Sequence, residues 1–135
     1  MGYLTKTGTL WGMIPQTLGQ VFWVAPSASY TVEGRTYSAS DDNDGLSPER
    51  AVRTGNRAVA LATASVGDLI VLLPGAHTSA TSPGITVNKA GLTIVGLGAG
   101  RLRPVFTFTT AAAASFDITA ANCLLQNLVF VCGIN

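Results

Sequence analysis

Carboxylates, one histidine and two cysteines are the side chains of this chain that could do acid, base or metal chemistry. Glycoside hydrolysis needs two carboxylates that face each other across the scissile bond, and calcium-dependent lyases need an acidic cluster with a basic residue. Six of the seven acids lie at or before Asp68, and Asp117 is the only one that follows it. Because no carboxylate pair can form on the later strands, we predict no catalytic residues, no cofactor and no enzymatic activity.

His77 and two arginines are the other polar candidates. His77 follows a Pro-Gly pair in a predicted turn without a nucleophile or acid beside it, so a solvated histidine is preferred to a catalytic one. Arg101 and Arg103 lie on a predicted loop. They could bind a sugar acid or a carboxylate of another protein, but a solvated loop is the preferred interpretation.

Cys123 and Cys132 cannot complete a four-ligand zinc site with a single histidine elsewhere. We interpret both as small buried side chains. A disulfide is possible, but they are only nine residues apart, which is less than one full turn of stacked strands, so their side chains are not expected to meet. Free thiols would fit assembly inside a cell.

The stretch from Asp41 to Gly45 predicts a tight turn, because Asp and Asn side chains bond back to their own backbone and glycine accepts positive φ. A calcium site is the alternative, with Asp42 and Asp44 as candidate ligands. On the EF-hand pattern, Ser40 supplies no carboxylate at the first position and Ala51 stands where the bidentate glutamate belongs. The self-bonded turn is therefore preferred, and no metal is predicted.

A helix and a strand must follow this turn. Thr54 is a suitable N-cap, and apolar residues with helical spacing follow it, so a helix is expected over residues 54–64. Gly67 would stop the helix. Asp68 to Leu73 is a short, nearly continuous apolar run, which predicts a strand buried on both faces.

The strand pattern recurs at offsets of 24 and 31 residues, which bring Ile70 onto Ile94 and Ile94 onto Leu125. Such offsets are typical of irregular stacked turns, in which inward side chains pack on those of the turn before. Glycine and asparagine tolerate the left-handed conformation, so corners are expected where these residues coincide. The coinciding pairs are Gly91 with Asn122 and Gly96 with Asn127.

Residues 1–20 are expected to form an extended arm, because glycine and proline interrupt any helix. Its apolar side chains would contact a neighbouring subunit or partner, or fold back over the end of the body.

Residues 21–24 form the predicted first strand, and residues 27–36 a small hairpin that turns near Glu33-Gly34. The expected division is an attachment part, 1–37, and a body, 38–135. The expected partner-binding residues are Trp11, Met13, Ile14, Leu18, Tyr30 and Tyr37.

Charge is sparse: the formal net charge is +1, and 11% of residues are charged against 47% apolar. Nucleic-acid binding is not predicted, because no large positive field exists. Residues 10–25 are apolar, but Pro15, Gln16 and Gln20 interrupt them, which argues against a signal peptide and a membrane span. The surface must consist largely of small neutral residues, and we expect part of it to lie in an interface.

Ser40 to Thr78 resembles the opening segment of right-handed parallel β-helix proteins of the pectin-lyase-like superfamily. Ala51 replaces a usual proline, and His77 replaces a usual aromatic. The resemblance implies an all-β right-handed parallel β-helix, or solenoid, with one short N-terminal capping α-helix and an extended N-terminal arm. It also implies that Asp68 accepts backbone N–H bonds at a corner. The matching residues are Ser40, Asp41, Asn43, Asp44, Gly45, Ser47, Pro48, Thr54, Gly67, Asp68, Ile70, Pro74, Gly75 and Thr78.

Proteins similar to this chain are frequent among tailed-phage virion proteins. The resemblance implies a non-enzymatic structural protein of a bacteriophage virion, located in the virion after assembly in the host cytoplasm. It would decorate or cement the capsid, or anchor a tail spike or fibre. Its expected partners are the major capsid protein or tail components. A homotrimer is also expected, because plain Ser, Thr and Ala faces would pack together.

Two other functions stay open. The chain could be the N-terminal part of a polysaccharide-binding or polysaccharide-degrading tail spike or lyase whose active site lies on later turns. A cell-surface adhesion module would need an export signal. The last predicted strand, Leu124 to Val131, is followed by nothing that resembles a cap, so either the natural chain continues or another chain covers this end.

Overall fold

The structure is a computed structural model that describes residues 19–78, 84–108 and 115–132. Four residues of the predicted arm, Trp11, Met13, Ile14 and Leu18, lie outside these ranges. The described elements are β1 (Val21–Val24), β2 (Ser29–Val32), β3 (Arg35–Ser38), η2 (Pro48–Arg50), α1 (Gly55–Leu61), β4 (Leu69–Leu72), β5 (Ala76–Thr78), β6 (Gly84–Val87), β7 (Thr93–Gly96), η3 (Gly100–Leu102), β8 (Val105–Phe108), β9 (Ser115–Ile118), β10 (Leu124–Gln126) and β11 (Val129–Cys132).

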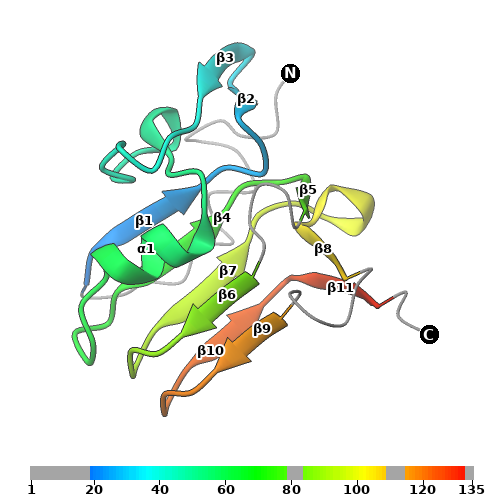
Figure 1. Cartoon of the computed structure of the whole chain (residues 1–135). Helices are drawn as coiled ribbons and strands as arrows, with labels where there is room; N and C mark the ends of the chain where they lie inside the picture. The colour runs from blue at the N-terminus through cyan, green and yellow to red at the C-terminus, as the bar shows by residue number, and fades with distance from the viewer. Residues whose placement is uncertain (1–18, 79–83, 109–114, 133–135) are drawn as a thin grey trace.

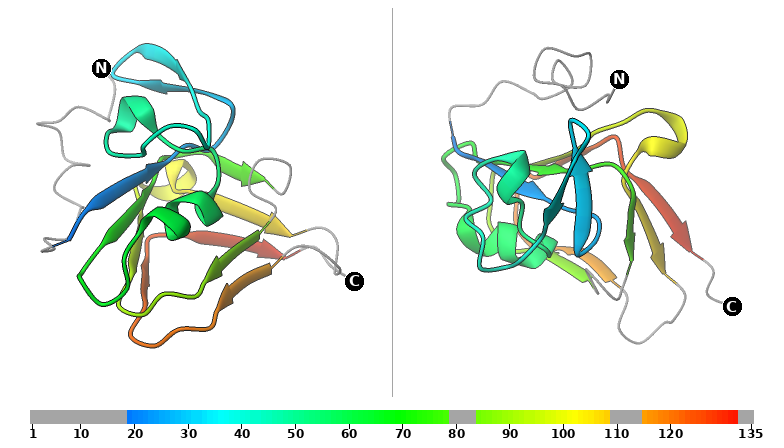
Figure 2. Two further views of the ribbon diagram at one scale, coloured as in Figure 1. Left: turned by 60° about the vertical axis from the view of Figure 1, so that its left-hand side comes forward. Right: turned by 90° about the horizontal axis from the view of Figure 1, so that it is seen from above.

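Three parallel sheets form the walls of the molecule. The main wall has four strands in the order β1-β4-β7-β10 (Figure 1). A second wall has the order β11-β8-β5, and a third consists of β6 and β9 (Figure 2). Because the chain passes from wall to wall, neighbouring strands within each sheet are distant in sequence. Strands β2 and β3 form a separate antiparallel hairpin.

The predicted all-β right-handed parallel β-helix is wrong for the described residues, which form a mixed structure. Sheets of four, three and two strands are joined by a hairpin and a helix, and no closed solenoid forms among these residues. The physical reason is that the walls differ in size: β1 adds a fourth strand to the main wall, and the chain after it forms the β2-β3 hairpin instead of strands of the other two walls. At the third wall, a helix covers β6. Helix α1 packs beside β6, where Gly55 lies too close to Ile85 to carry a Cβ. Asn56 Oδ1 accepts a hydrogen bond from the N–H of Thr86 (2.9 Å), so the helix occupies the edge that a further strand would need.

The strand registers confirm the predicted offsets even though the closed solenoid is absent. Ile70 pairs with Ile94, 24 residues later, and Ile94 pairs with Leu125, 31 residues later. On the third wall, Ile85 pairs with Phe116 at the same offset of 31. Repeating apolar positions therefore stack in register, because a slip of one residue would turn them away from the core.

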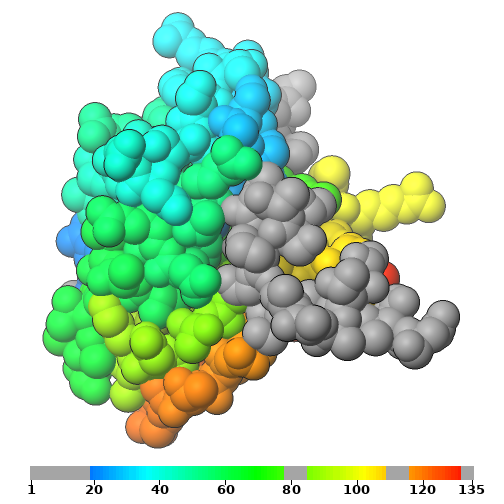
Figure 3. Space-filling view, in the orientation of Figure 1, coloured from blue at the N-terminus to red at the C-terminus, as the bar shows by residue number. Residues whose placement is uncertain are grey.

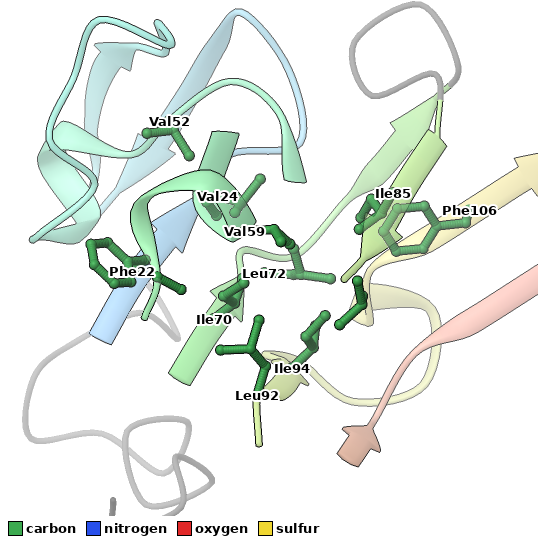
Figure 4. Close-up of a cluster of buried hydrophobic side chains, with 13 residues drawn as sticks. Phe22, Val24, Val52, Val59, Ile70, Leu72, Ile85, Leu92, Ile94 and Phe106 are labelled. Atoms are coloured by element: carbon green, nitrogen blue, oxygen red, sulfur yellow. The ribbon is translucent and has the colours of Figure 1, made fainter. Parts of the chain in front are cut away.

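Both faces of β4, an inner strand of the main wall, are buried, as predicted for the strand that follows Gly67. All four residues of β4 are buried. Ile70 and Ile94 point into a cluster between the walls that also takes Val59 from α1 (Figure 4). Val71 and Trp23 point the other way and join a second cluster. Successive side chains of these strands thus point into two different hydrophobic clusters. Because both directions lead into a core, the sequence shows a continuous apolar run.

Helix α1 begins as predicted, since Thr54 Oγ1 accepts the N–H of Arg57 (3.2 Å). It ends at Leu61, before the predicted residue 64. The ammonium group of Lys89 donates to the carbonyls of Ala60 and Ala62, so a distant side chain satisfies the last carbonyls and closes the helix early.

Three of the four predicted corner residues have positive φ: Gly91 (76°), Asn122 (59°) and Asn127 (58°). The prediction for Gly96 is wrong, because it lies within β7. A Cβ at Gly96 would collide with the carbonyl oxygen of Asn127, so glycine is needed there for close approach. Asn127 Nδ2 also donates to the carbonyls of Gly96 and Gly98 (2.8 Å each).

The first strand and the hairpin lie where they were predicted. β1 spans Val21–Val24, and β2 pairs with β3 around Glu33 (φ 50°) and Gly34 (φ 79°). Positive φ at both loop residues matches the twist of a two-residue hairpin. The division after residue 37 stays a prediction, and β1 on its N-terminal side pairs with β4 on its C-terminal side.

Candidate functional site

The Asp-rich turn is held together by its own side chains. Asp41 Oδ1 accepts the N–H groups of Arg53 and Thr54 (2.9 Å each), and its Oδ2 accepts the hydroxyl of Thr54 (2.8 Å). Asn43 Nδ2 donates to the carbonyl of Ala51 (2.9 Å). These bonds fasten the turn to the segment that leads into α1. The predicted self-bonded arrangement occurs at Asp44, whose Oδ1 accepts the N–H of Leu46, two residues later.

Asp44, the other predicted calcium candidate beside Asp42, is engaged by protein groups. The N–H of Leu46 (3.0 Å) and the guanidinium of Arg50 (3.0 Å) stabilise its carboxylate and lower its pKa. Asp42 is exposed. With both oxygens of Asp44 engaged, the turn does not fit a cation. In the part of the chain that the structure describes, no three His, Cys, Asp or Glu side chains gather as metal ligands would.

Asp68 has the structural role that the resemblance implied. Its buried carboxylate accepts the N–H of Gln20 at Oδ1 and the N–H of Thr63 at Oδ2 (2.7 Å each). One side chain therefore ties the start of β1 and the segment after α1 to the start of β4. The prediction of backbone hydrogen bonds at this corner is confirmed.

Tyr30 is not available to a partner, contrary to the prediction. Its side chain is 6% exposed, and its hydroxyl donates to the carbonyl of Pro48 (2.7 Å) and accepts the N–H of Ala51 (3.0 Å). Burial raises the pKa of Tyr30. Inward residues alternate with exposed ones along β2, and the same alternation in the sequence could have indicated that Tyr30 is buried. Tyr37 lies beside it and is partly buried, and its partner contact stays a prediction.

Tyr30→Phe should lower the free energy of unfolding by about 1–3 kcal/mol, because two buried backbone groups lose their hydrogen-bond partner. Urea denaturation would measure the change. Tyr37→Phe is the matched control and should change stability by less than about 0.5 kcal/mol. Equal effects of the two substitutions would show that the hydroxyl of Tyr30 does not hold the hairpin to the body.

His77 is buried, so the predicted solvated turn histidine is wrong. It lies in β5, and its ring stacks on Phe106 with 5.3 Å between the centroids. Nε2 is 2.9 Å from the carbonyl oxygen of Leu73; since a carbonyl only accepts, Nε2 carries the proton. Nδ1 has no hydrogen-bond partner among the described residues. Burial lowers the pKa of His77 to about 4, so the ring is a neutral packing group at pH 7.

The remaining predicted residues do not assemble into a site. Arg101 is exposed in η3, and Arg103 Nε donates to the nearby carbonyl of Gly100 (3.1 Å). Cys123 is a partly buried free thiol, and the side chain of Cys132 lies outside the described residues. The arginines therefore belong to a local loop, as the simpler interpretation held.

A groove of about 530 Å³ runs between α1 and β6. Two of its polar side chains already serve the fold, because Asn56 accepts from the N–H of Thr86 and Lys89 donates to the end of α1. The groove thus marks where the helix covers the third wall. Its lining residues are Asn56, Val59, Ala60, Thr86, Asn88 and Lys89.

The surface best suited to binding is formed by β9, β10 and β11, residues 115–132, which we call the open layer. Ile118 stacks on Val87, and Phe130 stacks on Phe106. The deeper residues are at most 2% exposed, whereas Ile118 is 45% exposed and Phe130 44%. Leu124 and Val131 are comparably exposed. Core positions therefore reach the surface here, and no part of the described chain covers them.

Comparisons with protein-family models, with curated proteins and with solved structures find no match to this chain. Within the described ranges, α1 is too short to cross a bilayer, and no other helix has the length and apolarity to do so.

Proposed function

We propose that this chain is a non-enzymatic structural subunit of a bacteriophage virion, which decorates or stabilises the capsid or anchors a tail spike or fibre. The open layer carries the proposal, because it combines exposed core residues with a single charged residue, Asp117, over residues 115–132. An apolar surface with almost no charge is typical of contacts between proteins.

The acidic residues support a structural role. Asp41 and Asp68 each receive two backbone N–H bonds, and Asp44 receives one together with an arginine. Carboxylates engaged in this way hold the backbone and have little freedom to bind a sugar or transfer a proton. The function they favour is a stable scaffold.

The virion is proposed as the assembly because of the resemblance of Ser40 to Thr78 to proteins that are frequent there. On this proposal the partners are the major capsid protein or tail components, with assembly in the host cytoplasm. Residues 1–37 provide attachment, and further copies associate through uncharged faces, with a trimer as the expected state.

Deleting residues 1–18 should leave a folded body that binds particles lacking this protein at least about tenfold more weakly, because Trp11, Met13, Ile14 and Leu18 are lost. The deletion keeps Gln20, whose N–H binds Asp68. Co-sedimentation measures binding, and the melting temperature reports the fold.

The matched pair of variants is Trp11→Ser and Leu46→Ser in the full chain. The first should weaken co-sedimentation, and the second, at an exposed leucine of the turn, should not. Unchanged binding of the truncated chain would move attachment to the body. Release of reducing ends or unsaturated uronates from polysaccharide by the purified chain would contradict the non-enzymatic role.

A further inference from the structure

The two ends of the stacked walls differ in how their strand edges are treated. At the first end, the outer edge of β1 is closed by residues 45–52. Trp23 donates to the carbonyl of Gly45 (2.8 Å) and accepts the N–H of Val52 (2.9 Å), while Ala25 donates to the carbonyl of Val52 (3.0 Å). Asn56 closes the edge of β6 in the same sense. The chain thus closes the edges of two of the three walls, at β1 and β6, with its own groups.

At the other end, all three walls stop together. β10 is the last strand of the main wall, β11 of the second and β9 of the third. Figure 1 shows β9 and β10 at the lower margin, and the space-filling view shows the same segment forming the lower surface (Figure 3). The open layer therefore presents three strand edges together with the apolar residues between them.

We propose that the open layer binds the open layer of a second copy of this chain across a two-fold axis. Head-to-tail stacking of copies is blocked at two walls, because residues 45–52 close the edge of β1 and Asn56 closes the edge of β6. The open layers of two copies therefore contact each other, which is the geometry of a closed two-fold contact. A two-fold axis that is perpendicular to the strands of one wall reverses their direction, so the edge strands of that wall meet antiparallel in the two copies.

The charge of the layer favours a second copy as the occupant. In a two-fold contact, each charged residue of one copy lies in the same interface as the identical residue of the other copy. Like charges in one interface oppose binding. Asp117 is the only charged residue among residues 115–132, so self-association meets little repulsion. The apolar residues also match, because each copy supplies the same exposed core positions, among them Ile118, Leu124 and Phe130.

The test is the mass of the full chain in solution, measured by sedimentation equilibrium over a concentration series. Phe130→Lys places a positive charge on both sides of the contact and should halve the mass, with the dissociation constant raised at least about tenfold. Ile118→Lys should do the same and does not disturb the aromatic stack of Phe130. Leu46→Lys, equally exposed but at the closed end, is the matched control and should keep the wild-type mass. Halving is expected whether or not copies also associate through their side faces.

Two results would overturn the pairing: a wild-type mass equal to that of Phe130→Lys, or the same loss of mass in Leu46→Lys. The proposed dimer rests on the proposed function only because both assign the open layer to protein contact. The experiments can contradict the dimer and the virion role separately. If the wild-type chain does not pair yet needs Phe130 to join particles, the layer binds another protein, so the pairing is wrong and the structural role stands. If the chain pairs and never joins particles, the virion role is wrong and the pairing stands.

Discussion

Ile94→Asp should lower the free energy of unfolding by at least about 3–5 kcal/mol at neutral pH. Ile94 is 2% exposed in β7, between Ile70 and Leu125 in the main wall. A carboxylate there would have no partner, and an unpaired buried charge costs about 3–5 kcal/mol or more. Domains of this size are stable by about 5–15 kcal/mol, so the loss removes much of the margin. The strands on either side would lose their packing as well, because each layer rests on the next.

Circular dichroism and urea denaturation would measure this effect. Ile94→Val should cost about 0.5–1.5 kcal/mol and keep the fold, which isolates the charge from the loss of volume. Val66→Asp, at an exposed valine, is the matched control for the new carboxylate and should be nearly neutral. A wild-type denaturation midpoint for Ile94→Asp would contradict the inward packing of this residue.

Acid should destabilise the chain by about 3 kcal/mol through His77 alone. The pKa of His77 is lowered from 6.5 to about 4 in the folded protein because burial disfavours the charged ring. Between these values the unfolded chain binds a proton that the folded chain does not. Stability is therefore complete above about pH 6.5 and falls as the pH decreases towards 4, by about 1.4 kcal/mol per pH unit.

The chain holds one histidine, so a single imidazole resonance in an NMR titration reports this pKa directly. His77→Phe keeps a ring against Phe106 and should flatten the dependence of stability on pH between 6.5 and 4. Above about pH 6.5, where the histidine is neutral in both states, the substitution should cost stability, since the carbonyl of Leu73 loses its donor. A measured pKa near 6.5 would show that the ring reaches solvent.

Several local features could be predicted because short-range physics decides them. The cap at Thr54 needs a hydroxyl ahead of a helix, and the turn at Glu33-Gly34 needs two residues that accept positive φ. These two features depend only on neighbouring residues. The role of Asp68 was predicted by the resemblance instead, because one of the N–H groups that it binds belongs to Gln20, 48 residues earlier in the chain.

The sequence by itself also determined the strand registers, since the period of the apolar residues admits one inward alignment of Ile70 with Ile94 and of Ile94 with Leu125. Only the tertiary structure decided the rest. The predicted solenoid fails because the three walls hold different numbers of strands: β1 extends only the main wall, and the chain that follows it pairs with itself in the β2-β3 hairpin. His77 and Tyr30 are polar by type but buried in place, because Leu73, Pro48 and Ala51 supply their hydrogen bonds. Whether a residue is buried depends on which surfaces the fold brings together. The chemistry of its side chain determines only the free-energy cost of burying it.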